Sequence, residues 1–374
     1  MSRNRSSIGR GCVPRWRHQA KWSPTEPKHQ DVDEKRGTAL YVTDLYVKAV
    51  DQLGSDKAPI RIGGLYALER LAQDNRVQRQ SIVEVICAYL RMPYTPPDDH
   101  PTPDNSGLPS SIEGAHTQPQ SHSSSNIGNG STDEPTRNSS EERQVRLTAQ
   151  RILARHLQPR THDATANPLY WGPEMVLDLT EATLVNLDFT GCHLHNATFT
   201  SATFAGDAKF DEATFTGVAR FEKATFACNA SFGEATFSGL AWFSKTTFTG
   251  YAWFGKATFA GNVSFGRATF TGYASFSAAT FGSDATFAGS ATFGKARFTS
   301  NAFFDATNFG GEARFGEAKF GGEARFAEAT FGAYASFNRT EFASLPVFKA
   351  AFQGLRSFEG ATANGSRYDG PAAE

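Results

Sequence analysis

Few side chains in this 374-residue sequence have the type and spacing that catalysis or metal binding needs. The clearest candidates are His193 and His195, which flank Leu194. Two imidazoles could begin a metal site. In an extended segment, however, both would point away from an inward leucine, and a zinc site needs about four ligands. We therefore interpret the pair as exposed polar residues and expect no metal.

A second candidate is Gly63-Gly64, because glycine-rich loops can hold phosphates. The pair has no flanking strand and no following Lys-Ser or Lys-Thr, which a phosphate-binding loop requires. We expect these glycines to serve helix packing instead. The sequence therefore predicts no catalytic residue, no cofactor and no small-molecule substrate, and we expect that the protein is not an enzyme.

The cysteines and the hydropathy of the sequence indicate the cellular compartment in which the protein resides. The four cysteines form no CxxC pair, which argues against a zinc knuckle or a disulfide framework and fits a reducing compartment. No apolar run approaches the roughly 20 residues that a membrane span needs. The basic N-terminus lacks the apolar stretch of a signal peptide. We expect a cytoplasmic protein with no membrane span.

Exposed aromatic residues form another group. Trp242 and Trp253 are eleven residues apart, and Tyr251 and Tyr273 are 22 apart. If one coil of a repeat takes roughly 22 residues, the tryptophans lie on opposite sides and the tyrosines stack on one edge. Exposed aromatics can anchor a protein partner, but stacking for stability is the interpretation that we favour.

Charge argues against a nucleic-acid-like surface. The formal net charge is -1, and residues 175–374 contain 18 acidic and 15 basic residues. We interpret the outer surface as a mixed-charge, solvated face. The interleaved charges are Asp211, Glu212, Lys223, Glu234, Lys245, Lys256, Glu312, Arg314, Glu317, Lys319, Glu323, Arg325 and Glu328. A mimic of duplex DNA would need a far more one-sided field.

These residues belong to a repeat that fills the second half of the chain. Phenylalanine is its mark: there are 32 Phe against 3 Met. Large apolar residues recur first every five residues, and then at steps that alternate between six and five. The repeat centres begin with Leu179, Leu184, Phe189, Leu194, Phe199, Phe204, Phe210, Phe215, Phe221, Phe226, Phe232, Phe237, Phe243, Phe248, Phe254, Phe259, Phe265, Phe270, Phe276, Phe281, Phe287, Phe293 and Phe298. They continue, with some fraying, to Phe358.

This spacing predicts a solenoid whose chain turns a corner after every unit. Each centre points inward, as does the small residue two positions earlier, while the residues between face solvent. Four sides close one coil, so 34 centres make about eight and a half coils and roughly 40 Å of stacked length. The rings should form four internal columns. Thr residues directly before the centres should form ladders on two opposite faces; their irregular T-x-T spacing disfavours an ice-binding surface.

The sixth residue of the longer steps needs a place. We expect it to widen the corner, with glycines such as Gly217 adopting left-handed dihedrals. Because the longer steps alternate, the widened corners should lie on two opposite edges. Two six-residue steps occur in a row at Phe287 and Phe293, and they should move the widened corners to the other pair of edges.

The A-x-[LF]-x-x register, as in Ala197-Thr198-Phe199, resembles that of the pentapeptide-repeat family over about 180 residues. This resemblance implies a right-handed quadrilateral β-helix, a mainly β solenoid. The sequence departs from the commonest form by using Phe for Leu, Thr for Asp or Asn, and the sixth residue. Residues 49–74 are similar to the helical segment that precedes the repeats in many bacterial, especially actinobacterial, members. Relatives with that segment often carry transmembrane helices upstream, and none is found here.

Composition and periodicity divide the chain into six parts. A small α-helical segment, with apolar residues at three- and four-residue steps such as Leu45, Ala49 and Leu53, precedes the solenoid. We expect a helix after the polar linker to pack on this segment. The parts are a disordered basic tail at 1–35, the helical segment at 36–92, a disordered linker at 93–140, the packing helix at 141–160, the solenoid at 177–360 and a tail at 361–374.

These features predict a non-enzymatic scaffold or protein–protein interaction module that presents a β-helical surface to an unknown protein partner. The alternative is a DNA mimic that binds DNA gyrase, a topoisomerase, as the family resemblance implies for some members; the near-neutral charge argues against it. The last coil, near Phe358, has no obvious polar cap, and open ends of such stacks can pair. We therefore expect a possible homodimer through the C-terminal coil.

Overall fold

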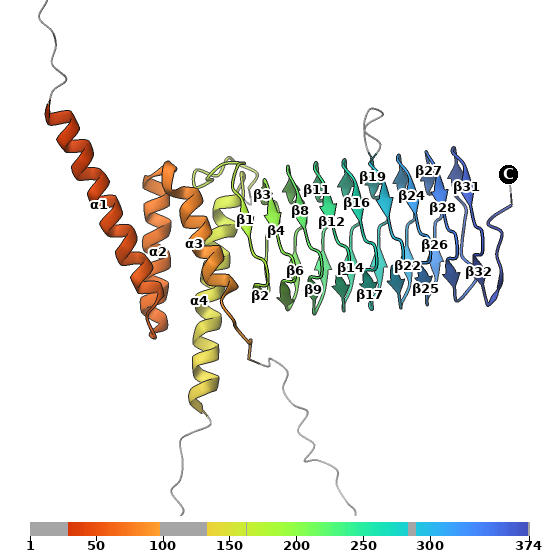
Figure 1. Cartoon of the computed structure of the whole chain (residues 1–374), viewed down its shortest axis with the longest axis horizontal. Helices are drawn as coiled ribbons and strands as arrows, with labels where there is room; N and C mark the ends of the chain where they lie inside the picture. The colour runs from red at the N-terminus through yellow and green to blue at the C-terminus, as the bar shows by residue number, and fades with distance from the viewer. Residues whose placement is uncertain (1–28, 98–132, 162, 283–288, 373–374) are drawn as a thin grey trace, which may run out of the picture. The chain divides into compact units, whose positions relative to one another are not determined.

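The computed structural model describes residues 29–97, 133–161, 163–282 and 289–372, with side chains from residue 40 in the first segment and 138 in the second. The chain divides into two compact units, 1–44 and 45–374. Helix α1 (His29–Leu53) begins in the first unit, where its Leu40 and Tyr41 are exposed. The second unit holds the remaining helices and the whole solenoid (Figure 1).

The helices after α1 pack through apolar stripes at helical spacing. They are α2 (Ala58–Asp74), the 3-10 turn η1 (Arg76–Gln78), α3 (Arg79–Arg91) and α4 (Asp133–Leu157). Helix α4 packs against α2 and α3. The side chains that are buried in this packing are Leu65, Leu68, Leu71, Ile82, Val83, Ile86, Leu90, Val145, Ala149, Ile152 and Leu153. Gly64 lets α2 approach α1, because a Cβ there would lie 2.8 Å from the Ala49 carbonyl oxygen, whereas Gly63 faces open space.

The helix boundaries differ from those expected. Helix α1 begins at His29, inside the expected tail, and α4 begins at Asp133, inside the expected linker. The rest of that linker, residues 98–132, lies outside the described residues. Leu45 is exposed although the periodicity placed it on a buried stripe, because the described contacts with α2 lie near the end of α1, at Ala49 and Leu53.

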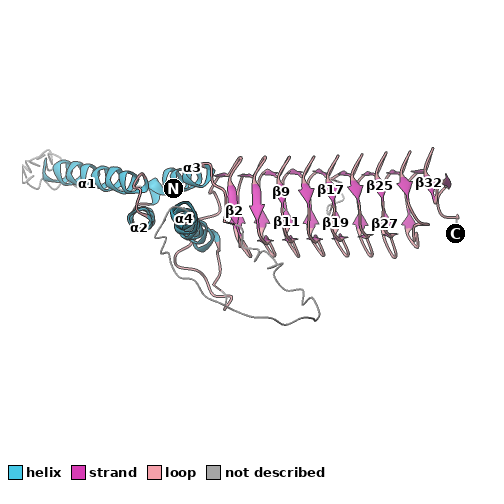
Figure 2. Cartoon of the chain, turned by 90° about the horizontal axis from the view of Figure 1, so that it is seen from below, coloured by secondary structure: helices cyan, strands magenta, loops and turns pink. Residues whose placement is uncertain are grey.

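The repeat region folds into four parallel sheets that make the four sides of a solenoid, here named sheets 1 to 4 in the order in which each coil visits them (Figures 1 and 2). Sheet 1 contains β1 (Leu177–Asp178), β4 (Ala197–Thr198), β8 (Ala219–Arg220), β12 (Ala241–Trp242), β16 (Val263–Ser264), β20 (Ala291–Thr292), β24 (Ala313–Arg314), β28 (Ala335–Ser336) and β31 (Arg356–Ser357). Sheet 2 contains β2 (Thr183–Val185), β5 (Thr203–Ala205), β9 (Thr225–Phe226), β13 (Thr247–Phe248), β17 (Thr269–Phe270), β21 (Arg297–Phe298), β25 (Lys319–Phe320), β29 (Glu341–Phe342), β32 (Thr362–Ala363) and the antiparallel β33 (Ser366–Arg367).

The other two sheets are shorter. Sheet 3 contains β6 (Ala208–Lys209), β10 (Ala230–Ser231), β14 (Ala252–Trp253), β18 (Ala274–Ser275), β22 (Ala302–Phe303) and β26 (Ala324–Arg325). Sheet 4 contains β3 (His193–Leu194), β7 (Thr214–Phe215), β11 (Thr236–Phe237), β15 (Thr258–Phe259), β19 (Thr280–Phe281), β23 (Asn308–Phe309), β27 (Thr330–Phe331) and β30 (Ala351–Phe352). The expected Thr ladders run along sheets 2 and 4, on opposite sides.

Stacked Phe rings fill the solenoid, so the predicted fold of about eight coils with four internal columns is confirmed. Within a column, rings of successive coils are nearly parallel: Phe215 and Phe237 have centroids 4.7 Å apart at 1°. Neighbouring columns meet edge to face, as Phe221 and Phe232 do at 5.5 Å and 90°. Both arrangements suit the charge distribution of aromatic rings. The repeat centres from Leu179 to Phe298 whose side chains are described are buried, and each ring contributes roughly 1.5–3 kcal/mol.

The two kinds of corner differ from what the sequence suggested. At a five-residue corner, the chain makes a tight turn in which Ala213 N–H donates to the Phe210 carbonyl, and Glu212 has a left-handed φ of 57°. Such non-glycine residues recur along the solenoid. Gly206, at the six-residue corner before Phe210, has the expected positive φ of 89°, but Gly217 and Gly239 at later six-residue corners do not. They are needed for close stacking, because a Cβ on Gly239 would overlap the Gly217 carbonyl.

The double six-residue step was also misread. Strand β19 lies in sheet 4 and β20 in the adjacent sheet 1, so the twelve residues from Phe281 to Phe293 span a single corner. Phe293 stacks directly on Phe265, with centroids 5.0 Å apart. Phe287 lies outside the described residues. The longer corners do occupy two opposite edges, as predicted, but they stay on those edges, because a local insertion leaves every later coil in register.

Both ends of the solenoid are covered. Helices α3 and α4 contact β1 and β2 (Figure 2), and the Gln150 amide exchanges two hydrogen bonds with the Val185 backbone, at 2.7 and 2.9 Å. At the other end, the expected tail at 361–374 instead adds β32 and β33. Tyr368 contacts the rings of Phe342, Phe348 and Phe358. The tail thus covers the last inward rings and extends sheet 2, whereas β31 and β30 are the end strands of sheets 1 and 4, and the homodimer stays a prediction.

Candidate functional site

The two histidines lie in different surroundings. His193 on β3 is half-buried, with the Tyr170 ring edge-on at 6.3 Å, and burial lowers the pKa of its imidazole. His195 is exposed and bonds the Thr216 hydroxyl at 3.0 Å. The expectation of two exposed imidazoles therefore applies only to His195. Among the residues with described side chains, no three His, Cys, Asp or Glu converge in a way that suits a metal ion.

Sheet 3 carries a group of outward aromatic residues, here named the aromatic patch: Tyr251, Trp253, Tyr273 and Phe303. Tyr251 and Trp253 are 64% and 51% exposed. The Tyr251 and Tyr273 rings meet edge to face at 6.1 Å, as their 22-residue separation predicted, and Tyr273 meets Phe303 at 5.0 Å. The patch thus continues across three successive coils, β14, β18 and β22, on one face.

Two glycines position the Trp253 indole. A Cβ on Gly255 would lie 2.8 Å from the indole ring, and a Cβ on Gly233 would lie 3.0 Å from its nitrogen. The ring therefore lies across backbone that carries no side chains. Beside it is an open hollow of about 420 Å³, whose wall includes Glu212, Glu234 and Lys256. Lys256 pairs with Glu234 at 2.9 Å, so only Glu212 of these three has no described ion pair.

The other end of the patch is fixed by a cation. The Arg325 guanidinium lies 4.0 Å from the centre of the Phe303 ring, and it also pairs with Asp305 at 2.5 Å. Sequence reasoning missed Phe303 and assigned Arg325 only to the mixed-charge surface. A signal was present: in Phe303-Phe304 one Phe is the inward centre, and its neighbour must face outward, where most strands of this sheet place a polar residue.

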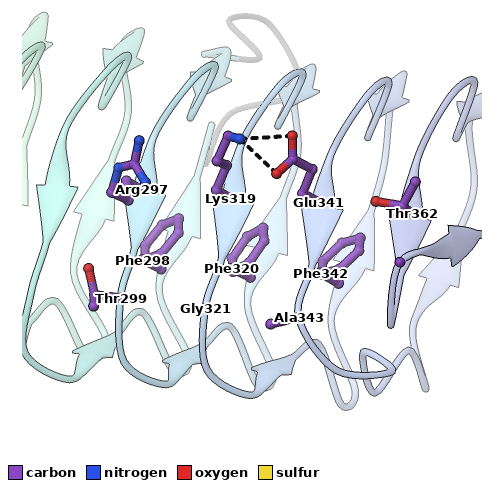
Figure 3. A pocket seen from close by; sticks show the side chains of 11 residues that line it. Arg297, Phe298, Thr299, Lys319, Phe320, Gly321, Glu341, Phe342, Ala343 and Thr362 are labelled. Atoms are coloured by element: carbon purple, nitrogen blue, oxygen red, sulfur yellow. Dashed lines mark hydrogen bonds and ion pairs between the residues drawn. The ribbon is translucent and has the colours of Figure 1, made fainter.

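A larger hollow of about 490 Å³ lies on sheet 2 (Figure 3). Arg297, Lys319 and Glu341 follow one another on β21, β25 and β29 along it. Both carboxylate oxygens of Glu341 accept hydrogen bonds from Lys319 Nζ, at 2.7 and 2.8 Å. Gly321 and Ala343, which carry no long side chain, leave room for this hollow, and its acid and base, Glu341 and Lys319, neutralise each other.

Trp242 lies on sheet 1, across the solenoid from Trp253 on sheet 3, as expected from their eleven-residue separation. It is half-buried, whereas Trp253 is half-exposed. The two tryptophans therefore belong to different surfaces. None of the described helices is long and apolar enough to cross a membrane.

The comparisons with known proteins concern the repeats alone. The family model for pentapeptide repeats (9 copies) matches overlapping segments that together cover residues 179–280 and 293–341. The matches are interrupted at the corner that contains the insertion. No curated protein and no solved structure matches the chain. The stacked sheets and the repeat matches coincide over these two segments, so this part of the solenoid is similar to pentapeptide repeats.

Proposed function

We propose that this protein is a non-enzymatic scaffold that binds a protein partner through the aromatic patch on sheet 3. The observation that carries the proposal is the exposure of Tyr251 and Trp253 on adjoining positions of one face. Exposed aromatic groups of this kind are enriched at the centres of protein interfaces, because they bury a large area with few rotatable bonds.

The solenoid itself does not require these side chains. The same outward position on sheet 3 is Lys209 on β6, Ser231 on β10 and Ser275 on β18. The edge contact between Tyr251 and Tyr273 contributes about 0.5–1.5 kcal/mol. This gain in stability explains why the two tyrosines stack, but it gives no reason for Trp253 to be exposed. The solenoid surface with its open hollows, and the absence of a converging nucleophile and base among the described residues, also favour binding over catalysis.

The test compares the wild-type protein with Tyr251→Ala/Trp253→Ala and with the control Trp242→Ala, which changes the opposite face. Each full-length protein is used to purify partners from its native host. We expect a partner that wild type and the control retain equally and that the double variant retains at least tenfold less. If all three proteins retain the same partners equally, the aromatic patch is not the binding surface.

The alternative, a DNA mimic that binds gyrase, is favoured less. A mimic needs a continuous acidic surface, whereas one corner of this solenoid carries basic residues in four successive coils, Lys223, Lys245, Arg267 and Lys295. A supercoiling assay with purified gyrase should show neither inhibition nor protection. We also infer a reducing, cytoplasmic location, since Cys228 is a free thiol at the surface.

A further inference from the structure

The corner between sheets 1 and 2 carries a row of cations. Lys223, Lys245, Arg267 and Lys295 occupy the left-handed position of the five-residue turn in four successive coils, with φ of 58–63°. All four side chains are exposed. The following strands β9, β13, β17 and β21 are hydrogen-bonded neighbours. At about 4.8 Å per coil, the row is roughly 14 Å long. We name these four residues the basic ridge.

Three of the four cations of the basic ridge lack the acidic partners that bases have elsewhere on the solenoid. Lys256, Lys319 and Arg325 pair with Glu234, Glu341 and Asp305, respectively. Lys223, Lys245 and Arg267, by contrast, have no ion pair among the described residues. Lys295 contacts Glu317 at 3.4 Å, at the end of the row. The mixed charge expected of the outer surface is thus uneven at this corner: bases hold the left-handed position in four successive coils, and the acid Glu317 follows in the next coil.

A trough lies beside the row. The residue before each cation is Ser244, Gly266 or Gly294 in the last three coils, and Gly316 follows. Together with Lys245, Arg267 and Lys295, they line a hollow of about 390 Å³. Sterics do not require these glycines: a Cβ on Gly294 would have its nearest neighbour, the Gly316 carbonyl oxygen, at 3.7 Å. The same turn position holds Glu222 before the trough and Asn338 after it. Glycine therefore leaves the trough open to an approaching backbone.

We propose that the basic ridge binds an extended acidic segment of a partner protein, lying in the trough along the solenoid axis. In such a segment, alternate side chains lie on one side at roughly 6.6 Å spacing, which flexible Lys and Arg side chains can follow. A nucleic acid fits less well, because no aromatic ring on which bases stack lines the trough. The ridge is separate from the aromatic patch, so either proposal can fail alone.

The test measures fluorescence anisotropy of a labelled ten-residue peptide in which Glu alternates with Thr, added to the full chain at 50 mM salt. The ridge variant combines Lys223→Gln, Lys245→Gln, Arg267→Gln and Lys295→Gln. A control variant removes the same charge elsewhere through Lys209→Gln, Lys256→Gln, Arg314→Gln and Lys349→Gln. We expect the ridge variant to bind at least about tenfold more weakly and the control to stay within about twofold of wild type.

A second variant separates the trough from the charge. Gly266→Asn/Gly294→Asn keeps every cation and fills the trough, and Asn338 shows that the turn accepts asparagine. We expect an unchanged far-UV spectrum and at least threefold weaker peptide binding. Single-stranded and duplex oligonucleotides serve as competing probes. The proposal is overturned if wild type does not bind the peptide, if the ridge variant binds it as well as the control does, or if either oligonucleotide binds more tightly.

Discussion

Left-handed residues at the five-residue corners show how this repeat tolerates local strain. Lys245 has φ 63°, yet its backbone N–H donates to the Gly266 carbonyl of the next coil at 2.9 Å. The equivalent bond recurs from coil to coil, as from Glu317 to Asn338. A side chain in this conformation costs roughly 1–2 kcal/mol. Stacking of each coil on the next holds the turn in place, and the side chains at these positions are free to serve the surface.

Because of this strain, substitution by glycine at such a position should increase the stability of the protein. Ala306 is exposed and has φ 51°. Ala306→Gly should stabilise the protein by about 0.5–1 kcal/mol, because the relief of strain exceeds the entropy lost by glycine. Ala302→Gly, in strand β22, should destabilise it. Urea denaturation of the two variants measures both changes, and a loss of stability in Ala306→Gly would contradict the account of the turn.

Glycines at the six-residue corners should behave in the opposite way. Gly239→Ala places a Cβ against the Gly217 carbonyl of the previous coil, and separating the coils there should cost about 1–3 kcal/mol. Gly316→Ala is the matched control, because its Cβ would find its nearest neighbour at 3.6 Å. The two midpoints of thermal unfolding, measured side by side, should differ by several degrees. Equal midpoints would mean that the coils tolerate this added methyl group.

At the scale of the element, the helical cap is held together by a buried polar cluster. The His156 ring is stacked on Trp171 at 4.0 Å and lies between the Leu169 carbonyl oxygen at 2.6 Å and Glu69 Oε1 at 2.7 Å. Arg155 reaches the same Glu69 oxygen at 2.9 Å. The cluster therefore joins α2, α4 and the segment that leads from α4 into the first coil.

Acid should loosen this cluster. Burial raises the pKa of Glu69, but the hydrogen bond and charge of His156, together with Arg155, outweigh it and hold that pKa below its usual 4.5. A carboxyl with a lower pKa in the folded state contributes stability above about pH 4.5, and this contribution is lost as pH falls through the folded-state value. Unfolding free energy should thus fall more steeply below pH 4.5 in wild type than in Glu69→Gln. The exposed Glu328→Gln should retain the wild-type slope.

Spacing predicted the inward rings, the two opposite edges and the register of Tyr251 and Tyr273, because all of these follow from counting residues along one coil. The caps could not be counted in this way. Gln150 and Tyr368 act through single long-range contacts outside the repeat. Left-handed dihedrals were expected at glycines of the six-residue corners, such as Gly217. Spacing could not reveal that such a glycine is needed because a carbonyl of the previous coil stacks against it. The exposure of the basic ridge also depends on which corner each charge occupies.

For the whole molecule, each coil contacts mainly the coils before and after it, so stability is close to a sum along the axis. Deletion of residues 308–329 removes 22 residues, one full coil, and joins Thr307 to Thr330. In the intact chain Thr307 is followed by Asn308 and the inward Phe309. In the shortened chain it is followed by Thr330 and the inward Phe331, which occupy the same positions on sheet 4. The shortened chain should fold cooperatively with a lower but defined thermal midpoint.

Deletion of residues 308–323 provides the contrast, because it removes 16 residues, three sides rather than four. It would stack six-residue corners on five-residue corners. The glycines of the six-residue corners leave space for a carbonyl of the previous coil, whereas the turn of a five-residue corner donates an N–H to a carbonyl of the next coil. We expect this variant to lose the cooperative transition in far-UV circular dichroism, although it removes fewer residues. If both deletion variants show the same cooperative transition, the match between corners of equal length does not set the register of the coils, and ring stacking alone must set it.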